Sequence, residues 1–385
     1  MNDMVFSEEQ RLLADTARDF LEVHCPVTAL RRLRDGKDAL GYDPEAWRKM
    51  VELGWTAIPF PESLGGLDFG YLGMGAVFEQ MGRTLAASPL FATVVLGGSA
   101  LLLGGSPAQQ AAHVPAIIAG ERRFALAVDE GRRHDPAAIA LAARKTGDGY
   151  TLDGDKVFVL DGQVADWLVV AARTSGAAGE RSGISLFLVE ANAPGVRRQG
   201  NAMLDSRNAA RISFDGVRVS AEALLGRADE AWDLLEEILD RGRACLAAEM
   251  LGIGQWLFDT TTKYLKERVQ FDVPIGSFQA LQHRAAWMYA ELELARSAVM
   301  AGLAAVNGAA AERRQLVSLA KAKMGTVLER ISGESVQMHG GIGVTDELDV
   351  GLYLKRGRVA RHTLGDNDFH AQRYGEGIGL LERLS

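Results

Sequence analysis

The chain has 385 residues, of which 48% are hydrophobic and 24% charged, and its formal net charge at pH 7 is -8. This length and composition allow a large buried core, and length alone suggests two or three domains. Basic residues occur in pairs and never in a longer block, which excludes the basic patch typical of a nucleic-acid-binding protein.

The cysteines and the N-terminal residues indicate the cellular compartment. Cys25 and Cys245 are far apart and have no Cys or His at metal-ligand spacing, so neither a disulfide framework nor a metal site is indicated. The first ten residues carry acids where a secretory signal carries positive charge, and no apolar run follows. The most apolar stretch, 90–105, is short and contains Gly-Gly-Ser, which favours a buried helix over a membrane span. We therefore expect a cytoplasmic protein without a transmembrane segment.

The first third of the chain, from Ser7 to about Gly120, has a helical pattern. Ser7 followed by Gln10 is an N-cap signature, and apolar residues then recur at helical spacing. A second helix is predicted over 44–53. The sequence P-F-P-E-S-L-G-G at 59–66 interrupts this pattern, because proline and paired glycines favour a loop.

The middle third has a β pattern. Short runs rich in β-branched and aromatic residues are separated by Gly and Asp, at 150–152, 157–160, 167–171, 184–189 and 211–219. The pairs Asp153-Gly154, Asp161-Gly162 and Asp215-Gly216 are predicted to be hairpin connections between them. From Ala231 onward, long helical patterns return. The predicted fold is therefore mostly α with a central β-domain, divided into residues 1–120, 121–226 and 227–385.

Two motifs in the last third are more specific. The sequence Y-L-K-E-R-V-Q-F-D-V-P-I-G-S-F-Q at 264–279 predicts the end of one helix, a break at 272–274, and a new helix that opens near Gln279. The sequence Q-M-H-G-G-I-G at 337–343 predicts a glycine-rich turn after a long helix. Its backbone N–H groups are suited to a phosphate or a ribose.

Together with P-E-S-L-G-G in the first third, these motifs resemble those of the acyl-CoA dehydrogenase family, and the resemblance covers almost the whole chain. It implies an N-terminal helical domain, a middle β-barrel or sandwich and a C-terminal four-helix bundle. It also implies FAD as cofactor, an acyl-CoA substrate oxidised at its α,β bond, an oligomer, and electron-transfer flavoprotein as acceptor. No complete G-x-G-x-x-G or P-loop is present, so a Rossmann FAD enzyme is not indicated.

In that family, residues of both motifs bind the FAD of a neighbouring subunit. A guanidinium suits the pyrophosphate of FAD better than a lysine does. An isolated Arg268 could instead pair with Glu267 or with an acid one turn earlier. Asp272 stands where the family has glycine, and Asp tolerates a left-handed turn conformation. The residues implied to complete the neighbour's site are Arg268, Gln270, Phe271, Gln279, Gln337, Gly340 and Gly341.

The positions that hold a subunit's own flavin differ from the family pattern. The family loop T-E-P-x-x-G-S-D, whose Thr and Ser bind FAD, is V-D-E-G-R-R-H-D here, with Val128 and His134 at the two hydroxyl positions. The family's W-I-T or W-I-S segment, whose hydroxyl reaches flavin N5, is Phe158, Val159 and Leu160 here. An aromatic residue remains, but the hydroxyls are lost.

The catalytic base is also missing from its usual place. In the family a glutamate removes the α-proton while the β-hydride passes to the flavin. Its position corresponds to Leu364, and the alternative position of some members to Gly242. Nearby carboxylates are Asp366, Glu249 and, on the alternative helix, Asp240. Asp366 also fits a helix N-cap, and Glu249 fits either a paired core carboxylate or a site residue with a raised pKa.

This asymmetry resembles the heteromeric acyl-CoA dehydrogenases of bacterial steroid side-chain breakdown, in which one subunit of each pair supplies the base. The hypothesis is that this chain is such a subunit. The alternatives are a homomeric enzyme that uses Asp366 or Glu249, a flavin-free protein that binds CoA thioesters or acts as a scaffold, and an oxidase or monooxygenase. The sequence does not determine the length or identity of the acyl group, because its pocket is built from scattered apolar residues.

Overall fold

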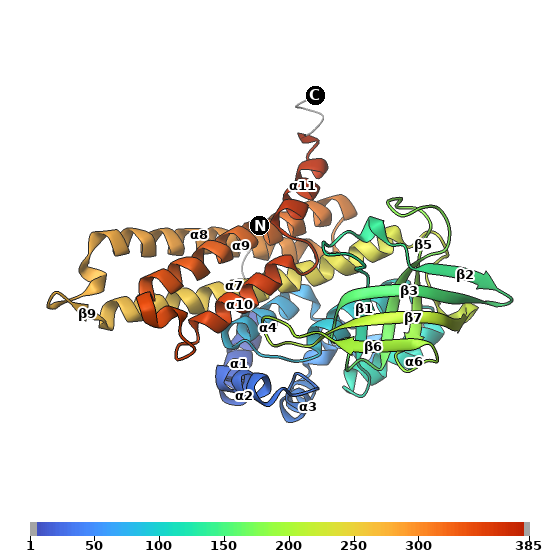
Figure 1. The fold of residues 1–385 in the computed structure, drawn as a ribbon, viewed down its shortest axis with the longest axis horizontal. Helices are drawn as coiled ribbons and strands as arrows, with labels where there is room; N and C mark the ends of the chain where they lie inside the picture. The colour runs from blue at the N-terminus through green and yellow to red at the C-terminus, as the bar shows by residue number, and fades with distance from the viewer. Residues whose placement is uncertain (1–5, 381–385) are drawn as a thin grey trace. The chain divides into compact units, whose positions relative to one another are not determined.

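The computed structural model describes residues 6–380 (Figure 1). The chain forms two compact units. Unit 1 combines Met1–Arg31, Tyr71–Ala86 and Arg243–Ser385, and unit 2 combines Arg32–Gly70 and Ala87–Gly242. Helices dominate, and one large sheet occupies the middle of the sequence, so the predicted fold class is confirmed. No helix within residues 6–380 is both long and apolar enough to cross a membrane.

The N-terminal third is helical, as predicted. Its elements are α1 (Glu8–His24), α2 (Val27–Gly36), α3 (Pro44–Glu52), η1 (Trp55–Ala57), η2 (Glu62–Leu64), α4 (Gly70–Thr84), the π-helical η3 (Phe91–Gly97), α5 (Gly98–Gly104) and α6 (Pro107–Ile118). The capping box at α1 is confirmed, because Ser7 Oγ accepts from the backbone N–H of Gln10 and the Gln10 side chain accepts from that of Ser7. The apolar stretch at 90–105 forms the largely buried helices η3 and α5.

The middle of the chain forms an eight-stranded sheet. Its strands are β1 (Phe124–Ala127), β2 (Ala142–Thr146), β3 (Gly149–Leu160), β4 (Trp167–Arg173), β5 (Ile184–Glu190), β6 (Val196–Gly200), β7 (Ala209–Ser220) and β8 (Leu224–Leu225), with η4 (Pro136–Ala138) and η5 (Ala221–Ala223) between them. The strand order is β6-β7-β3-β2-β4-β5-β8, and β1 pairs with β4 in parallel. Leu168, Phe187 and Ile212 are completely buried in its core.

None of the three predicted Asp-Gly hairpin connections is present as predicted. Asp153-Gly154 lies inside β3 and Asp215-Gly216 inside β7, and both strands continue for 12 residues. The pairing of β3 with β7 shifts register between Leu152 and Gly154, which makes this Asp-Gly pair part of a β-bulge. The Asp153 carboxylate accepts from the backbone N–H of Gly216 at 2.8 Å. Asp161-Gly162 does begin a turn after β3, but this turn is not a hairpin connection, because β2 lies between β3 and β4 in the sheet.

The C-terminal third contains long helices. Its elements are α7 (Trp232–Glu267), β9 (Val269–Gln270), β10 (Val273–Pro274), η6 (Ile275–Ser277), α8 (Gln279–Ala304), η7 (Ala305–Asn307), α9 (Ala310–His339), η8 (Gly340–Val344), α10 (Val350–His362) and α11 (Asn367–Gly377). Helices α8 and α9 run side by side, and the β9–β10 hairpin lies at one end of this pair (Figure 1).

Glycines allow α4 and α7 to cross closely within unit 1. A Cβ on Gly252 would lie 1.8 Å from the carbonyl oxygen of Glu79, and one on Gly82 would lie 2.0 Å from that of Glu249. Any larger residue would push the two backbones apart. Gly252 therefore serves helix packing, and this packing fixes the part of α7 that carries Glu249.

Candidate functional site

The first motif forms a tight hairpin between α7 and α8. Strands β9 and β10 pair across Phe271 and Asp272, whose φ angles are 54° and 60°. Two consecutive left-handed residues are typical of a type I′ turn. The expectation that Asp272 tolerates a left-handed conformation at the family's glycine position is confirmed.

Phe271 is unusual in this turn. A bulky aromatic side chain is disfavoured at positive φ, and such strain costs about 1–3 kcal/mol. Its side chain is nevertheless 86% exposed. The ring lies 6.1 Å from that of Phe278 in an edge-to-face arrangement. Burial within this chain therefore does not explain why an aromatic residue occupies the strained tip.

The structure brings the two motifs together at the ends of α7 and α9. The rings of Tyr264 and His339 lie 4.4 Å apart, and the Tyr264 hydroxyl donates to the His339 carbonyl at 3.4 Å. The His339 Nδ1 atom lies 2.7 Å from the carbonyl oxygen of Ser335, and the side chain is buried. His339 is therefore a packing and hydrogen-bonding residue that joins one motif to the other.

The residues implied to bind the neighbour's FAD are all exposed: Arg268, Gln270, Phe271, Gln279, Gln337, Gly340 and Gly341. Within residues 6–380, the Arg268 guanidinium has no ion pair and no hydrogen bond, so the alternative pairing with Glu267 is absent. Apart from the two flanking residues, no heavy atom lies within 4 Å of a Cβ built on Gly340 or Gly341, so the backbone there is open. An exposed guanidinium and an open glycine backbone fit the diphosphate of FAD.

The loop that is implied to hold the chain's own flavin, residues 128–135, lies in unit 2. Its polar groups form hydrogen bonds with each other and with Lys156. The His134 Nδ1 atom lies 2.8 Å from the carboxylate of Asp129, and the His134 side chain is 2% exposed. The Lys156 amine is completely buried and donates to the Val128 carbonyl at 2.9 Å and to Glu130 at 2.7 Å. Burial lowers the pKa of Lys156, and the Glu130 carboxylate opposes this effect. The loop thus offers no hydroxyl at either family position.

The second own-flavin segment, at the end of β3, is distorted. Phe158 has a φ of 54° and lies where the pairing with β7 shifts register between Lys156 and Val159. Phe158 and Leu160 are half-buried. Neither side chain can donate or accept a hydrogen bond, so the loss of the family's hydroxyl is not replaced at these positions.

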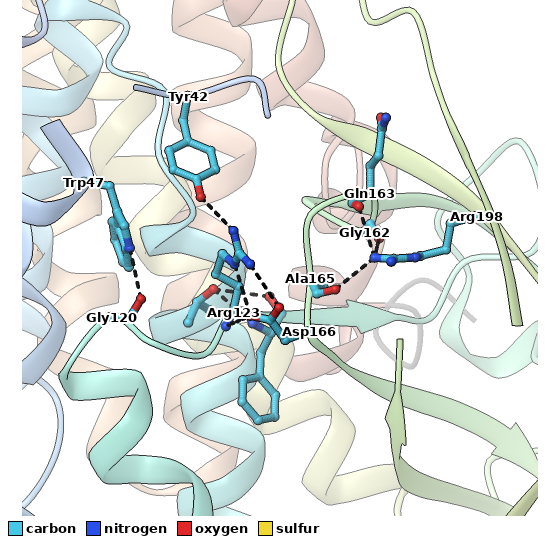
Figure 2. Close-up of polar contacts among 11 residues, drawn as sticks. Tyr42, Trp47, Gly120, Arg123, Gly162, Gln163, Ala165, Asp166 and Arg198 are labelled. Carbon is cyan, nitrogen blue, oxygen red and sulfur yellow. Dashed lines mark hydrogen bonds and ion pairs between the residues drawn. The ribbon is translucent and has the colours of Figure 1, made fainter. Parts of the chain in front are cut away.

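Arginines hold the connection between β3 and β4 from two sides (Figure 2). Arg123 donates through Nε and Nη2 to the Asp166 carboxylate at 3.1 and 3.0 Å and through Nη1 to the Tyr42 hydroxyl at 3.0 Å. The hydrogen bonds to Asp166 raise the pKa of Arg123 above its ordinary value. Arg198 donates to the carbonyls of Gly162, Gln163 and Ala165 at 3.3, 3.0 and 2.9 Å. No local sequence signal indicated this arrangement.

The position of the family's base is occupied by an apolar side chain. Leu364 is buried and has a φ of 57°. Its carbonyl oxygen accepts from Arg243 Nε at 3.0 Å and lies 3.1 Å from His370 Nε2. The buried Lys321 amine donates to the carbonyls of Ala360, Arg361 and Gly365 at 3.0, 3.0 and 3.1 Å. Burial lowers the pKa of Lys321 to about 7. The loop is held firmly, but it presents no carboxylate at this position.

The three nearby carboxylates are each capping a helix, paired or buried. Asp366 is the N-cap of α11 and accepts from the backbone N–H of Phe369 at 2.9 Å. Glu249 accepts two hydrogen bonds from Arg356, at 2.9 and 2.7 Å, and both side chains are buried. Asp240, on α7, is also buried. No local sequence signal indicated that Arg356 pairs with Glu249.

Three domain families match the chain in succession: acyl-CoA dehydrogenase N-terminal domain over residues 7–121, middle domain over 125–217 and C-terminal domain over 230–379. The chain belongs to the acyl-CoA dehydrogenase family. Acyl-CoA dehydrogenases are FAD-dependent oxidoreductases that act on CH–CH bonds, so the predicted enzyme class and cofactor are confirmed. FAD supplies the hydride acceptor of this chemistry.

Relatives match almost end to end. The caffeyl-CoA reductase-Etf complex subunit CarC of Acetobacterium woodii is 29% identical, over 92% of this chain and 94% of that protein. Butyryl-CoA dehydrogenase from Megasphaera elsdenii has a TM-score of 0.89 at 26% identity and covers 97% of this chain and 99% of its own. A chain of the ChsE4-ChsE5 complex from Mycobacterium tuberculosis has a TM-score of 0.87 at 29% identity. The match covers 98% of this chain and 99% of that chain. The fold and the family assignment therefore agree.

Proposed function

We propose that this acyl-CoA dehydrogenase chain is a subunit that completes the FAD site of a neighbouring subunit and relies on that neighbour for the catalytic base. One observation carries the proposal. The residues suited to a neighbour's FAD are exposed and open at the joined ends of α7 and α9, while the position of the family's glutamate holds the buried Leu364.

Charge and hydrogen-bonding capacity support this role. Arg268 is a cation without a partner in the described chain, and a diphosphate is a suitable anion for its planar donor fork. The Gln279 and Gln337 side chains each carry a donor and an acceptor, which suit the polar groups of a nucleotide. Phe271 presents an exposed apolar ring at the strained tip beside them. All of these groups stay available for a partner.

The altered own-flavin loop supports an unequal division of roles. The His134 ring lies within hydrogen-bonding distance of Asp129 in the same loop, and Val128 has no hydroxyl. A neighbour with the family's Thr, Ser and glutamate would bind FAD through its own β-domain. That glutamate would then remove the α-proton of the acyl-CoA, and this chain would hold the other side of the cofactor.

Two relatives make such a partnership reasonable. One is a complex of two proteins, ChsE4 and ChsE5, and another is a subunit of a complex that includes Etf. By analogy, we propose a second acyl-CoA dehydrogenase subunit as partner of this chain and an electron-transfer flavoprotein as the electron acceptor. The substrate class is an acyl-CoA thioester.

Flavin content of the chain alone and of a heteromer tests the proposal. The chain is purified alone, and also after co-expression with a family subunit that has the glutamate, and FAD is released and counted per subunit. The expected result is no FAD in the isolated chain and FAD in the heteromer. About one FAD per isolated chain would overturn the proposal and direct attention to Asp366 and Glu249 as bases.

Substitution at the proposed contact adds a matched control. Arg268→Ala in the heteromer is expected to weaken FAD binding by about ten- to a hundredfold, because charged hydrogen bonds contribute roughly 1.5–3 kcal/mol. Lys266→Ala removes an exposed cation two residues earlier, in the last turn of α7, and should leave FAD binding unchanged. Equal effects of the two variants would show that only general charge matters and would remove the specific role of Arg268.

A further inference from the structure

The segment that follows the second motif, residues 340–349, has little packing of its own. Gly340, Gly341, Ile342 and most later residues are exposed, and Val344 is 77% exposed. Gly343 is the one residue of 340–347 that is buried. A glycine-rich segment loses much conformational entropy when it is ordered, and apolar burial here does little to offset that loss. Its position must depend on other contacts.

One arginine from the N-terminal part of unit 1 supplies such contacts. Arg31, on α2, donates from Nε to the Asp349 carboxylate at 2.8 Å and from Nη1 to the Asp346 carboxylate at 3.0 Å. These carboxylates lie 318 and 315 residues further along the chain. The Arg31 side chain is 19% exposed, and that of Asp349 is 33% exposed. A single guanidinium therefore ties two points at the distal end of the segment.

The Asp349 side chain is used for the contact with Arg31 and not for a helix cap. Asp349 occupies the N-cap position of α10, but its side chain makes no capping bond and instead accepts from Arg31. Asp346 and Asp349 would repel each other without a cation between them. The rigid fork of an arginine can bond two separate carboxylates at once, whereas a lysine offers a single point charge.

We propose that Arg31 is a positioning residue that fixes segment 340–349 and thereby holds the open backbone of Gly340 and Gly341 in place for the neighbour's FAD. This inference rests on the proposed function. The proximal end of the segment is held by His339 against Tyr264, and Arg31 holds the distal end. With both ends fixed, the glycine backbone is pre-organised and binding loses less entropy.

Hydrogen–deuterium exchange of the isolated, full-length chain tests whether Arg31 fixes segment 340–349. Arg31→Met keeps an unbranched apolar side chain and removes all donors. Backbone amides of 340–349 are expected to exchange about tenfold faster in this variant, and Arg31→Lys should restore part of the protection. Arg34→Met is the matched control, because Arg34 lies on the same helix and pairs with the adjacent Asp35. Unchanged exchange in Arg31→Met would overturn the inference.

The effect of Arg31 on FAD binding is measured with the heteromer. Arg31→Met is expected to raise the Kd for FAD about tenfold, and Arg34→Met to leave it unchanged. Faster exchange of 340–349 with an unaltered FAD Kd would overturn the positioning role. A wild-type heteromer that binds no FAD would instead overturn the proposed function, and the exchange experiment distinguishes this failure from the other. If Arg31→Met does not fold, Asp349→Asn removes the ion pair from its other end and must give the same two changes.

Discussion

Replacing Glu249 with glutamine is expected to destabilise the isolated chain by about 3–5 kcal/mol. The reason is the buried pair with Arg356. The side chains of Glu249 and Arg356 are only 2% and 8% exposed, and two hydrogen bonds of 2.9 and 2.7 Å join them. Without the carboxylate, the buried guanidinium loses two charged hydrogen bonds, and the glutamine amide offers only one neutral acceptor oxygen in their place.

The magnitude can be measured by urea denaturation of the wild-type and variant chains. For a chain of 385 residues, the expected loss corresponds to a fall in Tm of roughly 4–6 °C. Glu329→Gln is the control, because Glu329 is 60% exposed in its pair with Arg361 and such surface pairs contribute at most about 1 kcal/mol.

A double variant tests the physical reason. Combining Glu249→Leu with Arg356→Met removes both charges, and the loss should shrink to about 1–2 kcal/mol, because apolar residues can replace a buried ion pair with little cost. A loss below about 0.5 kcal/mol in Glu249→Gln, or a double variant as unstable as the single one, would refute the reasoning. The first result would also favour Glu249 as a free site carboxylate.

Three further predictions concern single positions. Asp366→Asn should keep both the stability and the activity of the heteromer, because Asn caps helices as well as Asp does, whereas Asp366→Ala should cost about 1 kcal/mol; a large activity loss in Asp366→Asn would instead indicate a base. Burial, with a smaller contribution from Arg122, lowers the pKa of His113 from 6.5 to about 4. Between these values the unfolded chain binds more protons, so stability should fall as pH falls through this window, and the difference in Tm between pH 7 and pH 5 should be smaller in His113→Gln; equal differences would contradict the assignment. Phe271→Asn should leave the isolated chain equally stable or more stable, since Asn tolerates positive φ, yet weaken FAD binding by the heteromer; an unaltered FAD Kd would remove Phe271 from the site.

Local features were predictable because their causes lie close together in the chain. The capping box of Ser7 and Gln10 involves residues three apart, and the left-handed turn at Asp272 depends on the conformational tolerance of that one residue. The hairpin predictions at Asp153-Gly154 and Asp215-Gly216 were wrong for the opposite reason. Whether an Asp-Gly pair turns the chain or forms a bulge depends on the strand that pairs with it, and these pairs lie on neighbouring strands β3 and β7.

The contacts that define the candidate site were not predictable. Arg356 and Glu249 are 107 residues apart, and Arg31 and Asp349 are 318 apart. The apolar sequence around Glu249 indicated that this carboxylate is buried, but nothing local identified Arg356 as its partner. Arg31 viewed alone fits a solvated helix surface, so nothing local distinguished it from an ordinary exposed residue. The sequence likewise left open whether Asp366 caps a helix, and the structure shows that its carboxylate accepts from the backbone N–H of Phe369.

By itself, the sequence determined the fold class, the family motifs and the absence of a carboxylate at Leu364 and of hydroxyls at Val128 and Leu160, because these follow from residue identity and periodicity along the chain. Only the tertiary structure decided that Tyr264 meets His339, that Glu249 is paired and that Arg268 is left open. The physical reason is that the charge state and availability of a polar group depend on which partners the fold brings within hydrogen-bonding distance, and those partners come from distant parts of the chain.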